Sequence, residues 1–99
     1  MALTPRQARY LSSLAHALDP VVRVGQNGVT DAVVDKTDKE LENHELIKVK
    51  IDADRDGVKA AAETLTSGTH GDLVKIIGKI AILYRRRSKK PTIRLPAAD

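Results

Sequence analysis

The stretch VVRVGQNGVTD, residues 21–31, leads from a β-branched strand through a glycine-bounded loop into a helix. The valines are typical of a short strand that Gly25 stops, and Thr30-Asp31 is typical of a helix start. Between them, residues 25–28 place two small polar residues between two glycines, which leave room for a phosphate to approach the backbone. The stretch therefore predicts a strand, a candidate phosphate-contact loop and a helix.

A purely structural interpretation of this loop stays open, because turns between a strand and a helix often use glycine for steric reasons. Asn27 fits such a turn, since asparagine tolerates the left-handed backbone conformation. The loop is not a P-loop, because no Lys-Ser or Lys-Thr pair follows it at the required spacing. It also lacks the third glycine and the acidic partner of a dinucleotide-binding fingerprint. Its function therefore depends on what surrounds it.

Helices and strands alternate on both sides of the loop. Before it, Thr4-Pro5 begins a helix that Asp19-Pro20 ends, and its expected apolar face comprises Leu11, Leu14, Ala15 and Leu18. After it, the sequence predicts helices at 30–43 and from the acidic turn 52–56 to 67–68, and strands at 46–51, 73–77 and 79–84.

The order α-β-α-β-α-β-β predicts the α/β fold class. Strand-helix-strand units favour right-handed crossovers and parallel strands, whereas the break at Gly78 favours an antiparallel hairpin between the last two strands. We therefore expect a compact sandwich with a four-stranded mixed sheet. With 99 residues, 41% of them hydrophobic, the chain can form one modest core, so we expect a single domain over residues 1–96.

Strand 46–51 alternates in character. Its residues Ile47, Val49 and Ile51 are expected to face the core, and Lys48 and Lys50 to face solvent.

Composition excludes several classes of protein. The chain has no cysteine, which excludes disulfide scaffolds and cysteine-based zinc sites. No apolar run approaches the length of about 20 residues that a membrane span needs, and we expect no signal peptide. We therefore expect a cytoplasmic protein without a membrane partner.

The net charge of +4 is unevenly distributed. Residues 1–72 hold nine Lys or Arg against twelve Asp or Glu, whereas residues 73–99 hold eight against one. The basic excess is concentrated in residues 85–99, which we interpret as a basic C-terminal segment that is partly a tail. A solvated terminus that keeps the protein soluble is the alternative interpretation. A nucleic acid is the partner that such a surface favours.

Catalytic and metal-binding patterns are weak. His44 and Glu45 are adjacent, but consecutive residues point in different directions, and His16 and His70 are isolated. The acidic turn 52–56 lacks the glycine and glutamate of a calcium loop and is interpreted as a helix-opening turn. We therefore expect no enzyme, no catalytic residue, no metal, no cofactor and no small-molecule substrate.

Three sequence blocks together resemble a known family. They are GQNG after the valine-rich strand, HELIKVK at residues 44–50, and Ile77-Gly78-Lys79 leading into Leu83-Tyr84-Arg85. The combination resembles the CRM domain, and specifically the stand-alone bacterial YhbY-type RNA-binding proteins, from Leu3 to about Pro96.

The resemblance implies a fold similar to the C-terminal domain of translation initiation factor three, with a GxxG loop like that of KH domains. It also implies RNA binding, and for bacterial members association with ribosomal RNA in precursors of the large ribosomal subunit. Many plant relatives have a basic residue at the second loop position, where this chain has Gln26. Backbone N–H groups and side-chain amides would then contact the phosphates.

The predicted RNA-binding residues fall into two groups. The loop comprises Gly25, Gln26, Asn27 and Gly28, and the basic surface comprises Lys48, Lys50, Arg85, Arg86, Arg87, Lys89, Lys90, Arg6 and Arg9. Within the basic surface, the resemblance supports only Lys48, Lys50 and Arg85, and the others are included for their charge. With Tyr10 and Tyr84 as the only aromatic residues, the chain cannot build the base-stacking platform of an RRM.

The sequence therefore predicts a monomeric RNA-binding assembly factor for the large ribosomal subunit. The alternatives are a permanent structural ribosomal protein, a DNA-binding protein, and a small RNA-processing enzyme that would use His44 and Glu45.

Overall fold

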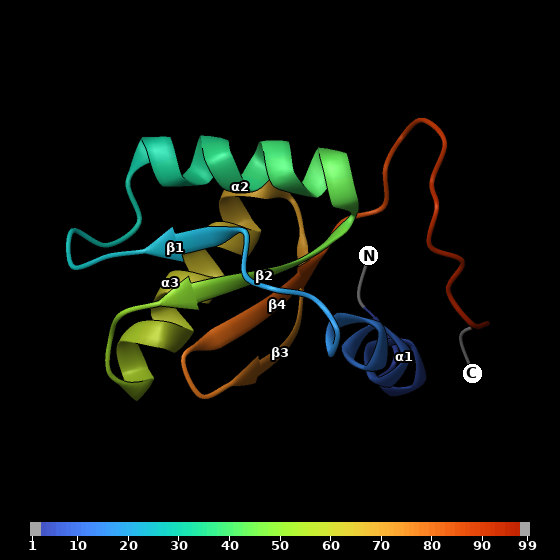
Figure 1. Ribbon diagram of the computed structural model, residues 1–99, viewed down its shortest axis with the longest axis horizontal. Helices are drawn as coiled ribbons and strands as arrows, with labels where there is room; N and C mark the ends of the chain where they lie inside the picture. The colour runs from blue at the N-terminus through green and yellow to red at the C-terminus, as the bar shows by residue number, and fades with distance from the viewer. Residues whose placement is uncertain (1–2, 98–99) are drawn as a thin grey trace.

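The computed structural model describes residues 3–97 and contains three helices and four strands (Figure 1). The helices are α1 (Pro5–Ala15), α2 (Asp31–His44) and α3 (Arg55–Thr69), and the strands are β1 (Val22–Val24), β2 (Leu46–Ile51), β3 (Asp72–Ile77) and β4 (Ile80–Tyr84). This order confirms the predicted α/β class. Within the described residues, none of the helices has the length and apolar character that crossing a membrane requires.

The four strands form one mixed sheet in the order β1-β2-β4-β3. Strand β1 is parallel to β2, because α2 carries the chain back between them. Strand β4 is antiparallel to both of its neighbours, β2 and β3. The tight turn after β3 uses Gly78 at a φ of 59°, which returns β4 beside β3 and inserts it into the middle of the sheet. The predicted mixed sheet and hairpin are confirmed.

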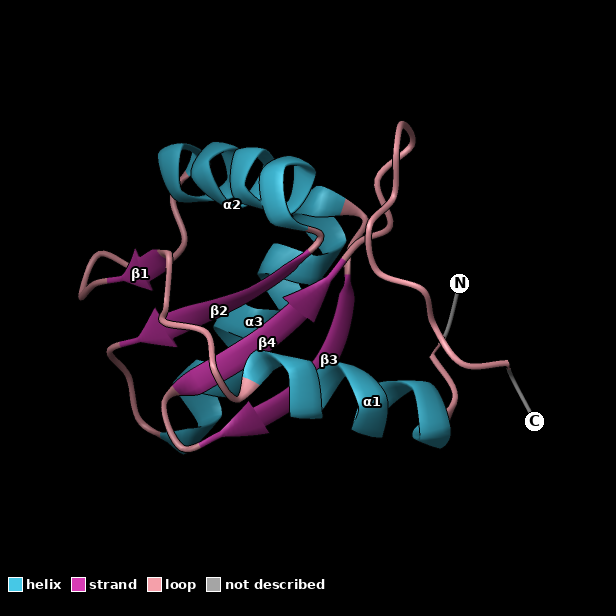
Figure 2. Ribbon diagram, turned by 45° about the vertical axis from the view of Figure 1, so that its right-hand side comes forward, coloured by secondary structure: helices cyan, strands magenta, loops and turns pink. Residues whose placement is uncertain are grey.

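Helices cover both faces of the sheet. Helices α2 and α3 pack on one face and α1 crosses the other (Figure 2). The larger core lies under α2 and α3 and consists of Val22, Val24, Leu41, Ile47, Val49, Ile51, Val58, Ala62, Leu65, Ala81 and Leu83. The smaller core lies under α1 and consists of Leu11, Ala15, Leu46, Ile82 and Tyr84.

Each helix begins at a side-chain cap. Thr4 and Gln7 form a capping box, in which the Gln7 N–H donates to Thr4 Oγ1 at 3.1 Å and the Thr4 N–H donates to Gln7 Oε1 at 3.1 Å. Thr30 caps α2, and Asp54 caps α3 through a 2.8 Å bond from the Gly57 N–H. The acidic turn is therefore a helix-opening turn, as predicted.

Helix α1 is shorter than its apolar pattern predicts. It ends at Ala15, so the expectation that Asp19-Pro20 ends it is wrong. Leu11 and Ala15 are buried, but Leu14 and Leu18 are each 39% exposed. The helix lies across β3 and β4 and turns only one narrow side to them, which leaves Leu14 outside the core.

The lysines of β2 are half-buried rather than fully exposed. Lys48 and Lys50 alternate with the buried Val49 and Ile51, as predicted. They share the sheet face that α1 covers in part, which removes some of the solvent expected around them.

The segment after β4 crosses the smaller core as a strap. We define the C-terminal strap as residues 86–97 of the described chain. Its Ile93 and Leu95 pack against the core under α1, and the Gln7 side-chain amide donates to the Pro96 carbonyl at 3.0 Å. The same glutamine therefore caps α1 and holds the far end of the strap.

Candidate nucleic-acid interface

The GxxG loop projects from one end of the sheet (Figure 1). The Gly28 N–H donates to the Gly25 carbonyl at 3.0 Å and closes the turn, and both Gln26 and Asn27 are exposed. A Cβ placed on Gly25 or on Gly28 would meet no protein atom within 4 Å. The space that the two glycines leave open is therefore available to a ligand.

The left-handed position of the turn is Gly28, with a φ of 74°, and not Asn27. The interpretation of Asn27 as a left-handed turn residue is therefore wrong. Glycine takes the position because it has no Cβ to clash there.

The N-terminus of α2 is a poorer candidate phosphate-binding site than the loop. Thr30 Oγ1 already accepts the Val33 N–H at 3.2 Å, and Asp31 places a carboxylate in the first turn. This charge opposes the binding of an anion at the helix terminus. The backbone of the loop is the better candidate for contact with a phosphate.

Strand register places several cations beside one another on the α1 face of the sheet. Arg23 of β1 is the partner of Lys50 of β2. Lys48 is the partner of Ile82 of β4, whose other partner is Lys75 of β3. Arg23 and Lys75 are exposed, and the two lysines of β2 are half-buried. We call Arg23, Lys48, Lys50 and Lys75 the basic sheet face.

The basic sheet face and the GxxG loop lie toward the same end of the molecule. The Asp52 N–H donates to the Val24 carbonyl at 2.9 Å, which joins the ends of β1 and β2 just before the loop begins. The Ile51 N–H donates to the Lys79 carbonyl at 2.8 Å, which brings the β3–β4 turn to the same end. We call this end of the sheet the loop edge.

Sequence reasoning missed Arg23, Lys75 and Lys79. Arg23 alternates with two buried valines, so its outward position was readable from the strand pattern. Its place beside Lys50 was not, because that requires the register of β1 on β2. A bulge between Leu73 and Lys75 shifts the register of β3, so simple alternation along the sequence does not predict which sheet face Lys75 occupies.

Arg85 has an intramolecular role in this structure. Its guanidinium donates from Nη1 to Asp38 Oδ1 at 2.6 Å and to the Thr69 carbonyl at 2.8 Å. From Nη2 it donates to the Asp38 carbonyl at 3.1 Å and to Glu42 at 3.4 Å. The group ties the end of β4 to α2 and to the last residue of α3, and its side chain is 20% exposed. We therefore leave Arg85 out of the candidate interface.

The other predicted cations lie elsewhere. Arg86, Lys89 and Lys90 are exposed on the strap, at the opposite end of the molecule from the GxxG loop, and Arg87 is half-buried there (Figure 1). Arg9 lies in a groove between α1 and β3 that Lys75 also lines, which connects it to the basic sheet face. Arg6 is exposed in the first turn of α1. The predicted basic surface is thus divided between two ends of the sheet.

His44 and Glu45 do not form a catalytic pair. His44 is exposed, with Nε2 at 3.6 Å from Glu40 Oε1. Glu45 is fully buried, and its carboxylate accepts hydrogen bonds from the strap. Among residues 3–97, no group of three or more His, Asp or Glu side chains is arranged to hold a metal ion.

The Glu45 carboxylate is charged despite its burial. Burial opposes its ionisation, but the hydrogen bonds that it accepts from Arg87, Thr92 and Ile93 outweigh this effect and lower its pKa from 4.5 to about 2. Glu45 is therefore a structural anion and not a general base.

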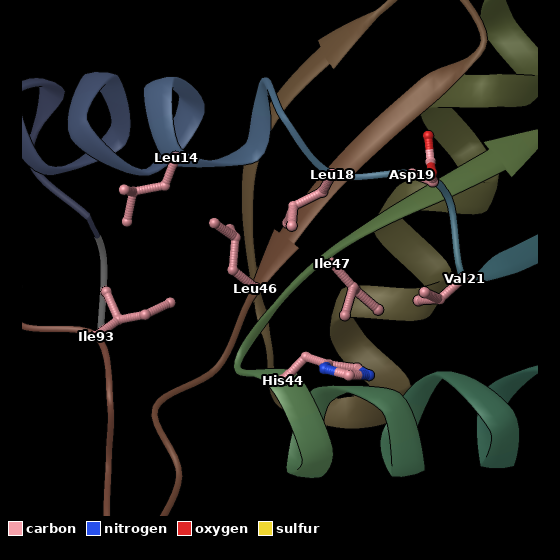
Figure 3. Close-up of a pocket in the computed structure, with 8 residues that line it drawn as sticks. All are labelled: Leu14, Leu18, Asp19, Val21, His44, Leu46, Ile47 and Ile93. Carbon is pink, nitrogen blue, oxygen red and sulfur yellow. The ribbon is translucent and has the colours of Figure 1, made fainter.

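An apolar pocket of about 400 Å³ lies between the end of α1, the start of β2 and the strap (Figure 3). Leu14, Leu46 and Ile93 point into it, and Leu18 of the linker after α1 adds to its lining. Among the described residues that line it, only Asp19 and His44 are polar, and they come from separate segments. The pocket accounts for the exposed leucines but lacks the converging polar groups of an active site.

The fold and the loop edge define a class of protein: a small mixed α/β domain that presents an exposed GxxG loop beside a basic sheet face. The chain belongs to the CRS1/YhbY (CRM) domain family, whose family model matches residues 3–85. This confirms the family that the sequence blocks resemble. The strap lies beyond the matched residues.

Named relatives and a solved structure agree with this assignment. A probable RNA-binding protein of Pseudomonas aeruginosa is 42% identical over 90 residues, which cover 90% of this chain and 86% of the relative. An RNA-binding protein of Haemophilus influenzae is 40% identical over 95 residues, which cover 95% of each chain.

The solution structure of a hypothetical protein from Staphylococcus aureus, described as a candidate RNA-binding protein, superposes with a TM-score of 0.84. The two chains are 41% identical, and the superposition covers 95% of this chain and 99% of the other. The fold of this chain is therefore shared across most of its length.

Proposed function

We propose that this protein binds RNA through its loop edge. The observation that carries the proposal is the presence of the exposed GxxG loop and the basic sheet face toward one end of the sheet, in a member of the CRM family. The names of the relatives support the same partner. In this proposal the loop backbone approaches a phosphate, and Arg23, Lys48, Lys50 and Lys75 neutralise the neighbouring phosphates.

Recognition at this edge is expected to depend on backbone and shape more than on base stacking. Tyr10 and Tyr84 are the only aromatic residues of the chain, and Tyr84 is buried under α1. Neither can form the stacked platform by which an RRM reads several bases. Affinity would therefore come mainly from charge and would fall steeply with salt.

Binding across a salt series tests the proposal. For contacts to Z phosphates of a single strand, the logarithm of the association constant should fall against the logarithm of salt concentration with a slope of about −0.7Z. The double variant Arg23→Ala/Lys50→Ala should reduce the magnitude of that slope by about 1.4, the value for two lost contacts.

The matched control is Lys39→Ala/Lys59→Ala, which removes two exposed lysines from α2 and α3. It should leave the slope nearly unchanged. RNA binding that is absent, or that does not respond to salt, would overturn the proposal.

We further propose that the RNA is ribosomal and that the protein acts in the cytoplasm as an assembly factor on precursors of the large subunit. The resemblance to bacterial YhbY-type proteins implies the ribosomal setting, and the match to the CRM family model supports that resemblance. A permanent ribosomal protein with the same loop edge is the competing possibility, and the two are distinguished by the particles on which the protein resides.

A further inference from the structure

One buried carboxylate closes the basic part of the strap into a loop. Glu45 Oε2 accepts the Arg87 N–H at 2.9 Å. Glu45 Oε1 accepts the N–H of Thr92 at 2.6 Å, the hydroxyl of Thr92 at 2.7 Å and the N–H of Ile93 at 3.0 Å. The two ends of residues 87–92 are thereby attached to the same side chain. We call residues 86–91 the strap loop.

Further contacts support the strap on both sides of this closure. The Arg85 N–H donates to the Glu45 carbonyl at 2.9 Å, just before the strap loop. After it, the partly buried Ile93 and Leu95 pack against the core under α1, and the Gln7 side-chain amide donates to the Pro96 carbonyl. The strap loop therefore leaves and re-enters the folded body at defined points, although it projects into solvent (Figure 2).

The residues that project from this closure are mostly cations. Arg86, Lys89 and Lys90 are exposed, and no ion pair is recorded for any of them among residues 3–97. Arg87 is half-buried, with Nη1 at 3.4 Å from the Asn43 carbonyl. The strap loop contains no Asp or Glu. The strap loop therefore carries four cations, and the one carboxylate that anchors it, Glu45, offsets only part of their charge.

The closure reduces the conformational entropy that the strap loop loses when its cations bind a partner. A mobile basic tail loses conformational entropy when it binds, because the backbone of each residue in it becomes fixed. A loop whose ends are already fixed loses less, so more of its electrostatic attraction appears as affinity.

We infer that the strap loop is a second contact surface for RNA phosphates, at the opposite end of the sheet from the GxxG loop, and that the protein bridges two backbone segments of one folded RNA. This inference rests on the proposed function. The longest dimension of the protein is 38 Å, so a strand of a few nucleotides at the loop edge would not reach the strap loop. The fitting partner is a structured RNA with two exposed backbone segments.

Two RNA probes separate the two surfaces. The first is a single strand of about four nucleotides, the length that a GxxG loop clamps in KH domains. The second is a hairpin with a stem of about 16 base pairs and a single-stranded extension, long enough to span the protein. Binding of the short probe is followed by NMR shifts at the loop edge, and binding of the hairpin by fluorescence anisotropy.

The test variant is Arg86→Ala/Lys89→Ala/Lys90→Ala, which alters only exposed side chains. It should weaken hairpin binding about tenfold or more and reduce the salt slope by about 0.9 for each lost contact. Its affinity for the short strand should stay within about twofold of the wild type, a difference of only about 0.4 kcal/mol.

The matched control Lys36→Ala/Lys39→Ala/Lys59→Ala removes the same charge from α2 and α3. It should affect hairpin binding far less than the strap variant. Equal losses in the two triple variants, or unchanged hairpin binding in the strap variant, would overturn the inference while leaving the proposed function intact. A wild-type protein that binds neither probe would instead overturn the proposed function.

Glu45→Gln tests the anchor itself. The amide keeps the shape of the side chain but replaces one acceptor oxygen by an NH2 group. Backbone N–H groups of Arg87, Thr92 and Ile93 surround the site and cannot accept from it, so the strap loop should loosen. Hairpin affinity should fall and short-strand affinity should not. Glu45→Asp, which keeps the charge, should restore part of the hairpin affinity. Loss of affinity for both probes would instead indicate general damage to the fold and would contradict a positioning role.

Discussion

Glu45 joins two features that each cost free energy, a carboxylate removed from solvent and a backbone φ of 64°. Four donated hydrogen bonds offset the burial of its charge. The position directly after α2 explains the geometry, because the Glu45 N–H still donates to the Leu41 carbonyl at 2.8 Å while the chain turns into β2. Glu45 therefore caps the end of α2, connects it to β2 and holds the strap.

The pKa of Glu45 predicts how stability depends on pH. Because folding lowers this pKa from 4.5 to about 2, the ionised carboxylate should contribute about 3 kcal/mol at pH 7. This contribution is complete above the unfolded pKa and is lost as the pH falls through the folded pKa. About 2 kcal/mol of it should be gone at pH 3.

Urea unfolding of the wild type and Glu45→Gln at pH 7 and at pH 3 measures the effect. The difference in unfolding free energy between the two proteins should shrink on acidification. A difference of the same size at both pH values would contradict the assigned ionisation.

The two glycines of the GxxG loop should respond differently to alanine. Gly28→Ala places a Cβ at a φ of 74° and should cost about 1 kcal/mol of stability. Gly25→Ala has open space around its Cβ and should change stability by less than about 0.5 kcal/mol. It should nevertheless weaken RNA binding, because the methyl group fills the space left for a phosphate.

Thermal unfolding and RNA titration of the two alanine variants separate these effects. Gly25→Ala with wild-type affinity would remove the loop backbone from the proposed interface.

At the scale of elements, Arg85 fastens β4 to α2 and α3. Arg85→Met keeps the length of the side chain but removes its hydrogen bonds to Asp38, Glu42 and the Thr69 carbonyl. Since both carboxylates are more than half exposed, much of the ion-pair attraction is screened, and we expect a loss of about 1–2 kcal/mol.

The matched substitution Arg86→Met, at an exposed neighbour, should change stability by less than about 0.5 kcal/mol. Chemical denaturation of both variants checks the pair. If Arg85→Met kept full stability and lost RNA affinity instead, Arg85 would belong to the interface after all.

Local signals in the sequence were sufficient for most of the elements. Thr4-Pro5, Thr30 and the acidic turn each begin a helix, because caps and first-turn residues act within a few positions along the chain. The register of the sheet could not be predicted from such local signals. The pairings of Arg23 with Lys50 and of Lys48 and Lys75 with Ile82 depend on contacts between distant segments.

The same limit applies to the candidate site. The loop was readable, because glycine spacing is local. The family resemblance assigned Arg85 to the basic surface, and charge alone assigned the strap cations to it. In the structure Arg85 forms hydrogen bonds with carbonyl and carboxylate groups of the protein itself. The strap cations lie at the end of the sheet opposite the GxxG loop. Only the fold reveals which positive charges are already engaged.

At the scale of the whole molecule, the two basic surfaces lie at opposite ends of the sheet, in a protein that measures 38 × 26 × 24 Å. This arrangement suits a protein that holds neighbouring parts of an RNA in place while it folds. Helix α2 lies on the other face with several acidic residues, so RNA is not expected to wrap around the protein.

Sucrose gradients of cell extracts test the proposed setting of this activity. An assembly factor should sediment with precursors of the large subunit and be scarce on mature ribosomes. Equal amounts on mature subunits would favour a permanent ribosomal protein. Competition between RNA and duplex DNA for the purified protein would exclude or support the DNA-binding alternative.

The two edges of the sheet bear on how copies of this protein meet each other. An open edge strand can pair with another chain and start aggregation. Here β1 has only three residues, and β3 is interrupted by a bulge beside the exposed Lys75. Short, irregular and positively charged edges discourage such pairing. The cations proposed to attract RNA would thus also keep the protein dispersed at high concentration, before any RNA is bound.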